Sequence, residues 1–432
     1  MAALSAHSHR RRARILLRLL LPGLGGWPRC CGASSLEVPT PLRVLDPVAV
    51  GHVRWVEAPA GRRLEVRTLS TDPVVFLVPG FLDEAEADEV VELALQSREW
   101  RDSHVDQNQE VRWQLTRGGK KARRVLRSYD ADRDGKLSVA EMAHLAEEAF
   151  TMPNYDHADF VRYALGEATD PRAAIPLRVA FRAKVARFFS KVLREEPHRL
   201  GRFSQQTWMP YEGPLLRTLL SRAQSLAQLP EEVMNNTESL QVVHYSRKGH
   251  YACHHDSSPD SIDEGSIRIG TVGIFLSNVT QGGETVFPAA FRKDTASWGP
   301  EEWGDFEHRC QRTEACTQLG GLKVVPKKGD GVFWYNVKPW AVNEARGAQQ
   351  PEGFGDRALI WSSMHCAAEV VEGDKWFANL WLHMDAEGKA ESDRKDEADF
   401  DKEEEADLEM TEAELEMAEA ALAKGDPKVE EL

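Results

Sequence analysis

The chain has 432 residues, of which 42% are hydrophobic and 28% are charged. This length and composition suffice for one large core or several smaller ones, and they exclude an intrinsically disordered chain. The formal net charge is −15 and no basic domain stands out, which argues against a protein that binds nucleic acid.

The N-terminal segment, residues 1–36, carries six arginines and no acidic residue. Its apolar run, Ile15–Leu21, is interrupted by Arg18 and is shorter than the roughly 20 residues that a membrane span needs. Arginines before an apolar run and small residues after it are typical of a secretory signal, and the alternative is an Arg-rich mitochondrial transit peptide. We therefore expect a signal peptide or a signal anchor, and the sequence leaves membrane attachment open.

Two further features favour the secretory route. Asn235 and Asn278 each begin a glycosylation sequon, and the last four residues, Val429–Leu432, are close to an ER-retention ending. The expected location is the endoplasmic reticulum, either in the lumen or anchored to the membrane and facing the lumen, with mitochondria as the alternative. In an oxidising lumen, Cys310 and Cys316 are near enough in sequence to form a disulfide.

The first predicted elements after the N-terminal segment are a strand and a helix. The β-branched run Val74–Val78 predicts the strand, and Pro79 and Gly80 then turn the chain into a helix through Asp83–Gln96. The acidic first turn of this helix suits the positive end of the helix dipole. A charged, helical region follows at residues 101–200.

A calcium-binding loop is predicted within this helical region. Calcium requires several oxygen ligands, and three aspartates at alternating positions, a glycine at position 6 and a glutamate at position 12 form the EF-hand pattern. The helices Ala122–Ser128 and Ala140–Phe150 would flank it, and the alternative is an acidic surface turn. The candidate calcium ligands are Asp130, Asp132, Asp134, Lys136, Ser138 and Glu141.

A second EF-hand without metal is expected after the first, because EF-hands usually occur in pairs. Phe160–Leu165 and Leu177–Phe189 would flank a loop at 168–179 that has Ile175 at the apolar position and almost no carboxylates. One calcium ion per chain is therefore expected.

Short β-rich segments separated by glycines begin at Leu240 and predict an antiparallel sandwich or barrel. Between two of them, Ala289–Gly321 is long enough for an Ω-like excursion or a lid. The predicted strands are Leu240–Ser246, Thr271–Leu276, Glu284–Phe287, Val332–Asn336, Ala358–His365 and Lys375–Leu382.

The C-terminal segment, residues 385–432, has 20 acidic and 6 basic residues. Leucines at seven-residue intervals predict a helix, which we interpret as a solvated single helix. Oligomerisation through this helix is the alternative, and the oligomeric state stays open.

A metal site is predicted from His254, Asp256 and His365. Residues two apart on a strand point the same way, so His254 and Asp256 can reach one metal while His255 points to the opposite face. Two histidines and one carboxylate leave open positions on a metal, as in non-haem Fe(II) oxygenases. The alternative for His365 is a satisfied core histidine.

A buried cation is predicted beside this metal. If Ala358–His365 and Lys375–Leu382 pair as a hairpin, alternation places Lys375, Phe377, Asn379 and Trp381 on one face inside the barrel. A buried ammonium needs an anion, and the distal carboxylate of 2-oxoglutarate would be one, with Tyr251 adding a hydroxyl. The alternative for Lys375 is a charged residue that protects a strand edge.

The order of these motifs resembles the catalytic domain of the prolyl 4-hydroxylases. The resemblance extends from about Leu240 to Met384, and Val78–Leu82 is similar to the start of that domain. The EF-hand upstream adds a resemblance to the EF-hand-containing transmembrane members of the family in the endoplasmic reticulum. The matching residues are Tyr251, His254, Asp256, the GGETVFP run Gly282–Pro288, Gly331–Asn336, His365, Lys375 and Trp376.

The resemblance implies an α+β protein whose oxygenase domain is a double-stranded β-helix, or jelly roll, with an inserted helical EF-hand region. It implies Fe(II) held by His254, Asp256 and His365, 2-oxoglutarate held by Lys375 and Tyr251, and ascorbate to restore oxidised iron. The expected domains are 1–36, the signal; 37–100, the N-terminal part of the oxygenase domain; 101–200, the EF-hand region; 201–384, the Fe(II)/2-oxoglutarate dioxygenase domain; and 385–432, the acidic tail.

The implied reaction couples O2 and 2-oxoglutarate to 4-hydroxylation of a proline in a protein or peptide partner. Whether that proline is of the procollagen type or of the hypoxia-inducible-factor type stays open. Two alternatives remain: a 2-oxoglutarate oxygenase acting on another residue or a small molecule, and a calcium-binding scaffold with an inactive barrel.

Overall fold

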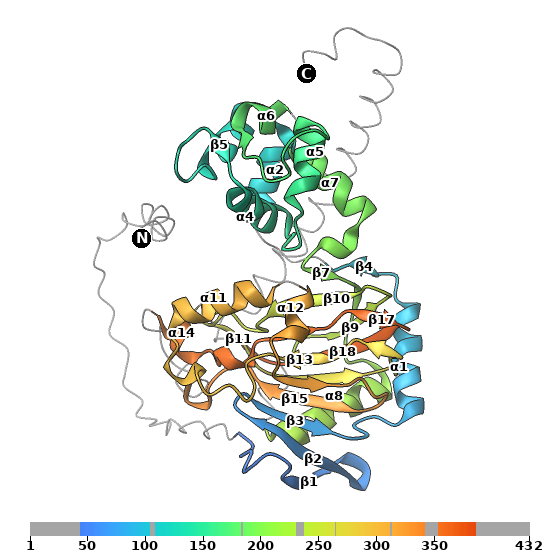
Figure 1. Ribbon diagram of the computed structural model, residues 1–432. Helices are drawn as coiled ribbons and strands as arrows, with labels where there is room; N and C mark the ends of the chain where they lie inside the picture. The colour runs from blue at the N-terminus through green and yellow to red at the C-terminus, as the bar shows by residue number, and fades with distance from the viewer. Residues whose placement is uncertain are drawn as a thin grey trace, which may run out of the picture. The chain divides into compact units, whose positions relative to one another are not determined.

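The computed structural model of the protein (Figure 1) describes residues 44–103, 109–182, 185–229, 237–263, 265–311, 313–341 and 353–385. The predicted signal at 1–36, the acidic tail beyond Asp385 and the glycosylation candidate Asn235 lie outside these ranges. A search of the described helices finds none that combines the length and the apolar character needed to cross a membrane.

The larger of two facing antiparallel sheets contains nine strands. They are β1 (Val53–Ala58), β2 (Arg62–Thr71), β3 (Val74–Val78), β4 (Arg101–Asp102), β8 (Gln205–Met209), β9 (Leu240–Tyr245), β11 (Ser266–Phe275), β15 (Gly331–Tyr335) and β18 (Lys375–Asp385). Their order is β1-β2-β3-β15-β11-β18-β9-β8-β4.

The smaller sheet contains β7 (Arg202–Phe203), β10 (His250–His254), β13 (Thr285–Phe287), β14 (Leu322–Val324) and β16 (His365–Ala367), in the order β14-β13-β16-β10-β7. A separate pair joins β12 (Gln281–Gly282) to β17 (Val370–Glu372). An apolar core fills the space between the sheets, where Phe287 of the smaller sheet meets Trp334 of the larger one with ring centroids 5.3 Å apart. Two antiparallel sheets around a shared core are consistent with the expected jelly roll.

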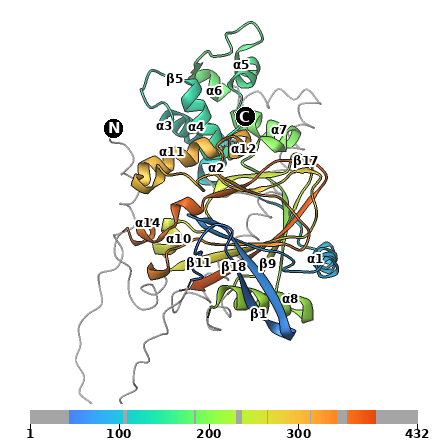
Figure 2. The ribbon, with the colours of Figure 1, turned by 60° about the horizontal axis from the view of Figure 1, so that its bottom comes forward.

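Helices cover the outer face of the larger sheet (Figure 2). They are α1 (Glu84–Gln96), α8 (Gly213–Ala227), α10 (Pro259–Asp263) and α14 (Phe354–Ala358). Asp83 begins α1 with a capping box, because its side chain accepts from the Glu86 N–H at 2.8 Å while Glu86 accepts from the Asp83 N–H at 2.9 Å. Short 3-10 turns occur at η1 (Pro59–Gly61), η2 (Pro197–Arg199), η3 (Thr295–Ser297) and η4 (Trp361–Ser363).

Two helices, α11 (Pro300–Cys310) and α12 (Thr313–Gln318), pack through a second apolar cluster on the outer face of the smaller sheet. They belong to the segment Ala289–Gly321, for which the sequence predicts an Ω-like excursion or a lid. Pro300 at the first helical position and the capping interaction of Glu302 with the Gly299 N–H, at 2.9 Å, explain why α11 forms there.

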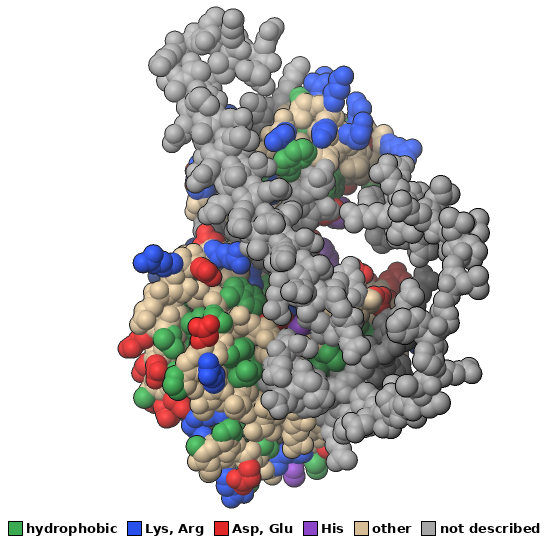
Figure 3. All heavy atoms as spheres, turned by 180° about the vertical axis from the view of Figure 1, so that it is seen from behind, with side chains coloured by type: hydrophobic (Ala, Val, Ile, Leu, Met, Phe, Trp, Pro, Cys, Tyr) green, Lys and Arg blue, Asp and Glu red, His purple; other side chains and the backbone are tan. Residues whose placement is uncertain are grey.

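The region between β4 and β7 is helical and has its own core, in which Phe150 stacks on Phe189 at 4.4 Å. Lys and Arg side chains gather on the exposed surface of this region (Figure 3), and α3 has five basic residues among ten. Its elements are α2 (Gln109–Arg117), α3 (Gly119–Ser128), β5 (Lys136–Leu137), α4 (Val139–Phe150), α5 (His157–Leu165), β6 (Ile175–Pro176), α6 (Leu177–Arg182) and α7 (Val185–Glu195).

The predicted strand Ala358–His365 is wrong. The chain forms α14, then η4, and only His365–Ala367 is a strand. Local hydrogen bonds explain the difference, because the Ser363 N–H donates to the Ile360 carbonyl at 2.8 Å and the Ser363 hydroxyl donates to the same carbonyl at 2.6 Å. The predicted hairpin is therefore also wrong, since β16 pairs with β10 and β13 while β18 pairs with β9 and β11.

Candidate functional site

Two antiparallel strands bring the three candidate metal ligands together. His254 ends β10, His365 begins β16, and these two residues face each other in the strand pairing. Asp256 follows two residues after His254, with its Oδ1 3.7 Å from His254 Nε2 and its Oδ2 3.7 Å from His365 Nε2. The three ligand atoms all lie within 4.8 Å of one another, as a group that could hold one metal ion.

Hydrogen bonds orient each ligand toward this point. Nδ1 of His254 lies 2.8 Å from the Ala252 carbonyl, and Nδ1 of His365 lies 3.1 Å from the Ser363 carbonyl. When each Nδ1–H donates to its carbonyl, each Nε2 carries the lone pair that a metal requires.

The carboxylate is held by a second chain of hydrogen bonds. The buried hydroxyl of Thr271 donates to Asp256 Oδ2 at 2.6 Å and accepts from Asn336 Nδ2 at 3.0 Å. Thr271 lies in β11 and Asn336 follows β15, so the larger sheet fixes a ligand that the smaller sheet presents.

The protonation states of the pair suit metal binding. Burial lowers the pKa of His254 well below its ordinary value, and the charge of His365 adds to that effect. Burial acts to raise the pKa of Asp256, but the two histidines and Thr271 outweigh it and hold that pKa below its usual value. At neutral pH His254 is therefore neutral and Asp256 is ionised, which are the forms that bind a metal.

His255 lies between His254 and Asp256 and is one of the residues that line the cavity around the candidate metal site. Its Nε2 lies 2.9 Å from the Trp361 carbonyl, and burial lowers its pKa to about 4. It is not in the group of three described residues that could hold the metal ion.

A cavity of about 390 Å³ contains the three ligands and lies between the two sheets. This volume falls within the usual range for small-molecule sites. Trp334 and Trp381 are among its lining residues, and their buried indole N–H groups have no hydrogen-bond partner among the described residues.

Lys375, the first residue of β18, lies in the same cavity with 1% of its surface exposed. Its ammonium lies 4.9 Å from the ring centroid of Phe377 and 5.3 Å from that of Tyr245. Burial lowers its pKa to about 7, and the charge of Glu284 opposes the shift without reversing it. An anionic ligand bound beside Lys375 would stabilise its protonated, charged form, so the site favours an anion.

Tyr251 stacks on His254, with ring centroids 3.6 Å apart, and the Arg202 guanidinium lies 4.5 Å from the centroid of the same Tyr251 ring. Its assignment to 2-oxoglutarate stays a prediction. Tyr245, which the sequence did not single out, pairs with Lys375 across β9 and β18. Strand alternation within the predicted segment Leu240–Ser246 was the signal that could have identified it.

Further cavity residues carry no motif in the sequence. Arg202 comes from the two-residue strand β7 and pairs with Tyr251, and Arg268 lies 3.7 Å from the Trp381 ring centroid while binding Glu238 through two contacts of 2.6 and 2.7 Å. The positions of Arg202 and Arg268 depend on contacts between distant segments of the chain, which local sequence patterns do not predict. The remaining lining residues include Gln206, Trp208, Gln241, Thr285 and Asn379.

The candidate calcium loop lies between α3 and α4. Asp130, Asp132 and Asp134 have carboxylate oxygens within 4.8 Å of one another, and Asp130 Oδ1 is buried without a hydrogen-bond partner among the described residues. Glu141 accepts from the Ala131 N–H at 2.7 Å and from the Ser138 N–H at 2.8 Å. The loop therefore closes on itself with oxygens gathered at its centre.

The second loop pairs with the first through their apolar positions. Leu137 of β5 faces Ile175 of β6, and Lys136 faces Pro176. The two loops are therefore joined by a short antiparallel pairing. Within the described residues, the predicted helix Leu177–Phe189 falls on α6 and α7, and residues 183 and 184 between them lie outside the described ranges.

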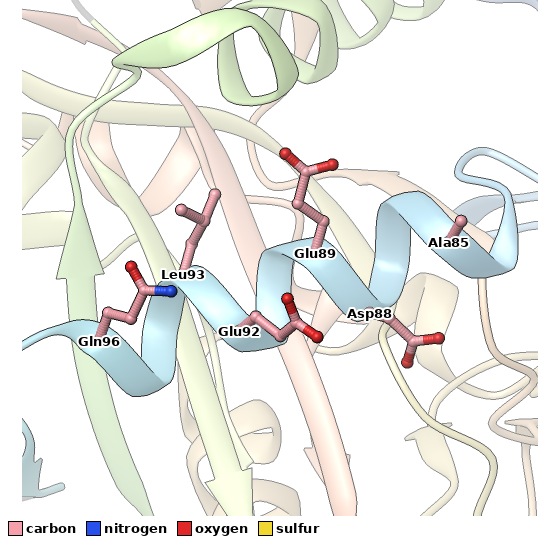
Figure 4. A pocket seen from close by; sticks show the side chains of 6 residues that line it. All are labelled: Ala85, Asp88, Glu89, Glu92, Leu93 and Gln96. Atoms are coloured by element: carbon pink, nitrogen blue, oxygen red, sulfur yellow. The ribbon is translucent and has the colours of Figure 1, made fainter.

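A second hollow lies along the outer face of α1 (Figure 4) and is lined by Ala85, Asp88, Glu89, Glu92, Leu93 and Gln96. It is lined by acidic side chains without histidine or cysteine, and Asp88 is already paired with Lys328 Nζ at 2.5 Å. We assign no function to it.

The predicted Cys310–Cys316 disulfide is wrong. Cys310 bonds to Cys253 and Cys316 bonds to Cys366, because α11 and α12 each turn their cysteine onto the smaller sheet. The second glycosylation candidate, Asn278, is exposed and accepts from the Lys328 N–H at 2.9 Å.

Residues 240–383 match the model of the 2OG-Fe(II) oxygenase superfamily. The transmembrane prolyl 4-hydroxylase of Mus musculus is 30% identical over 379 residues, which cover 82% of this chain and 72% of that relative. The transmembrane prolyl 4-hydroxylase of Homo sapiens is 30% identical over 371 residues, which cover 80% of this chain and 70% of that relative.

Among solved structures, a viral collagen prolyl hydroxylase of Paramecium Bursaria Chlorella virus-1 in complex with 2OG is 23% identical. It covers 42% of this chain and 80% of that chain with a TM-score of 0.28, which is too low to add to the argument. The family model, the two relatives and the site geometry agree. The chain belongs to the prolyl 4-hydroxylase family and is an Fe(II)- and 2-oxoglutarate-dependent dioxygenase.

Proposed function

We propose that the protein is a peptidyl-proline 4-hydroxylase in which His254, Asp256 and His365 hold Fe(II) and Lys375 holds 2-oxoglutarate. The observation that carries this proposal is a buried lysine in the same cavity as two histidines and a carboxylate. The donor set is the one that suits Fe(II) oxygenases. Lys375 supplies a cation for the far carboxylate of the dicarboxylic acid.

When bound, Fe(II) and 2-oxoglutarate would supply the oxidising chemistry: O2 gives one oxygen atom to the proline and one to the succinate that forms with CO2. The protein's own residues orient the metal ligands and shield the site from water. Thr271 keeps Asp256 ionised and aimed, the Nδ1 contacts aim the imidazoles, and the aromatic walls exclude water.

A proline substrate is supported by the names of the relatives and by the cavity walls. Trp208 and Trp381 lie 5.4 Å apart at an interplanar angle of 36°, and both line the cavity. Aromatic surfaces of this kind suit the apolar ring of proline in an extended peptide. We propose a proline-containing protein or peptide as the partner.

We further propose that the 101–200 region is an EF-hand pair that binds one Ca2+ through the loop Asp130–Glu141. The unpartnered oxygen of Asp130 and the β5–β6 pairing support this proposal. Ascorbate as a reductant for oxidised iron is proposed from the family resemblance alone.

The proposed location is the lumen of the endoplasmic reticulum. Two buried disulfides support a location on the secretory route, because disulfides persist in oxidising compartments. The exposed sequon at Asn278 agrees with it.

The experiment incubates the full chain with Fe(II), 2-oxoglutarate, ascorbate and a mixed library of proline-containing peptides. We expect peptide-stimulated succinate and a gain of one oxygen on proline, with 4-hydroxyproline identified by amino-acid analysis. Asp256→Ala serves as the matched inactive variant. Succinate formation without oxidised proline would reject the proline substrate and retain the dioxygenase.

A further inference from the structure

Each of the two histidines proposed to bind iron is adjacent in sequence to a disulfide-bonded cysteine. Cys253 immediately precedes His254 and is bonded to Cys310, and Cys366 immediately follows His365 and is bonded to Cys316. The bridges close segments with sequence separations of 57 and 50 residues. The candidate ligands are thus covalently linked to distant parts of the chain.

Both bridges lead to the same insertion. Cys310 is the last residue of α11 and Cys316 lies in α12, and both helices belong to the segment between β13 and β14. Figure 1 shows α11 and α12 beside β10, and their buried side chains pack against the smaller sheet. The sulfur atoms of Cys253, Cys316 and Cys366 lie within 4.8 Å of one another, so the two bridges are also neighbours.

The backbone alone constrains this part of the sheet weakly. β16 has only three residues, and its pairing with β10 shifts register between Tyr251 and His254, immediately before the first candidate ligand. A register irregularity interrupts the ladder of hydrogen bonds that would otherwise fix the histidine positions. The bridges supply a constraint at the place where the ladder does not.

The helices to which the bridges lead are firmly seated. Cys310 and Phe306 are fully buried, and Trp303 of α11 stacks against Trp361 at 6.5 Å and an interplanar angle of 19°. Trp361 also provides the carbonyl that contacts His255. The insertion is therefore packed against the segments on both sides of the candidate metal site.

We infer that Cys253, Cys310, Cys316 and Cys366 are positioning residues for iron: the α11–α12 insertion acts as a doubly bridged clamp that holds β10 and β16 at the separation the metal requires. This inference rests on the proposed iron ligands. It gives the insertion a role at the metal centre and makes metal affinity depend on the oxidised state of both bridges.

The test compares the full wild-type chain with Cys253→Ala/Cys310→Ala and with Cys316→Ala/Cys366→Ala. Each chain is titrated without iron or substrate by Co(II), whose visible absorption reports affinity and ligand geometry. Each double variant should bind Co(II) about 10-fold or more weakly, the loss typical when support behind metal ligands is removed. Hydrogen exchange of β10 and β16 should accelerate while that of β11 and β18 stays as in wild type.

Phe306→Leu is the matched control. It loosens the packing of α11 but leaves both bridges in place, so its melting temperature should fall while its Co(II) affinity and spectrum remain those of wild type. A purely structural role of the disulfides would instead make affinity follow melting temperature in all three variants, and that result would overturn the inference.

A second measurement on the wild-type chain does not require the double variants to fold. By linkage, a metal that the bridged state binds more tightly must oppose reduction of the bridges. Reduction transfers two electrons and two protons from a dithiol to each bridge, giving two thiols and an oxidised dithiol. Saturating Mn(II) should shift the dithiol concentration for half-reduction upward several-fold, and an unchanged midpoint would contradict the clamp. Neither readout uses turnover, so a failed proline assay leaves this test intact.

Discussion

Lys375 is a buried cation in the cavity that holds the candidate metal ligands. An ammonium surrounded by Tyr245, Phe275 and Phe377 is costly to keep charged, which is why its pKa falls from 10.5 to about 7. The position was predicted from the sequence through strand alternation, although the hairpin partner assumed for β18 was wrong. The alternation holds because it depends only on the strand itself.

The affinity for 2-oxoglutarate should depend on pH through Lys375. The empty site holds a half-neutral amine near pH 7, and the dicarboxylate binds the charged form, so binding takes up a proton above that pH. We expect the Kd for 2-oxoglutarate, measured by calorimetry with Mn(II) in place of iron, to rise up to about tenfold per pH unit between pH 7.5 and 9.

The matched variant for this experiment is Lys375→Met, which preserves length and removes the charge. It should bind 2-oxoglutarate far more weakly and lose the pH dependence. Between pH 7 and 10.5 the Lys375 side chain binds a proton in the unfolded chain but not in the folded chain. The free energy of unfolding of the wild type therefore rises with pH over that window, and Lys375→Met should lose this contribution. A wild-type Kd for 2-oxoglutarate that does not change with pH would show that its carboxylate does not bind Lys375.

The hydroxyl of Thr271 supports the candidate metal ligand Asp256. Thr271→Val keeps the shape of the side chain but removes the 2.6 Å hydrogen bond to Asp256. We expect metal affinity to fall about 10-fold, with folding retained, in a Co(II) titration. Thr207→Val is the control, since Thr207 is equally buried but its hydroxyl contacts Ser97 at 2.7 Å. Equal metal affinities for the two variants would show that the Thr271 hydrogen bond does not support metal binding.

At the scale of elements, α1 and α8 are joined by one carboxylate. Glu86 accepts from both terminal nitrogens of Arg222, at 2.6 and 2.8 Å, and from Arg62 at 3.2 Å. Burial acts to raise the pKa of Glu86, but the hydrogen bonds from Arg222 and Asp83 and the charge of Arg62 outweigh it and lower that pKa to about 2. The helices therefore share an ion-pair network behind the larger sheet.

Glu86→Gln should lower the free energy of unfolding at pH 7 by about 1–2 kcal/mol, a value discounted because Glu86 is partly exposed to solvent. A depressed carboxyl pKa stabilises the fold above pH 4.5, and this contribution disappears as the pH falls toward 2. Urea unfolding at several pH values measures the difference. Glu89→Gln, on the exposed face of α1, is the control, and a pH-independent difference for Glu86→Gln would refute the electrostatic explanation.

The proposed calcium loop Asp130–Glu141 connects α3 to α4. Asp130→Ala combined with Glu141→Ala removes the first and last ligands of the proposed loop, so we expect loss of the single Ca2+ site in titration calorimetry. Asp170→Ala in the partner loop should leave binding unchanged, because that loop lacks the other carboxylates. Wild-type calcium affinity in the first variant would reject the loop assignment. A shift in melting temperature without a change in turnover would identify the ion as structural.

For the whole molecule, the sequence was sufficient where function depends on local spacing. The strand Val74–Val78 and the helix begun by Asp83 are confirmed. The ligand atoms of His254 and Asp256 lie close together, although β10 ends at His254 and Asp256 follows the strand. Local pattern failed where distant segments decide the structure. The disulfide partners, the clamp helices in place of an irregular loop, and the contacts of Arg202 and Arg268 all depend on how the two sheets meet.

The central claim is that this cavity couples O2 and 2-oxoglutarate to proline oxidation. The most direct measurement is turnover of a proline peptide by the full chain under 18O2, with mass spectrometry of both products. We expect equal amounts of hydroxyproline and succinate, each carrying one labelled oxygen atom, and neither product with Asp256→Ala. Peptide oxygen derived from water, or labelled succinate without any oxidised proline, would contradict it.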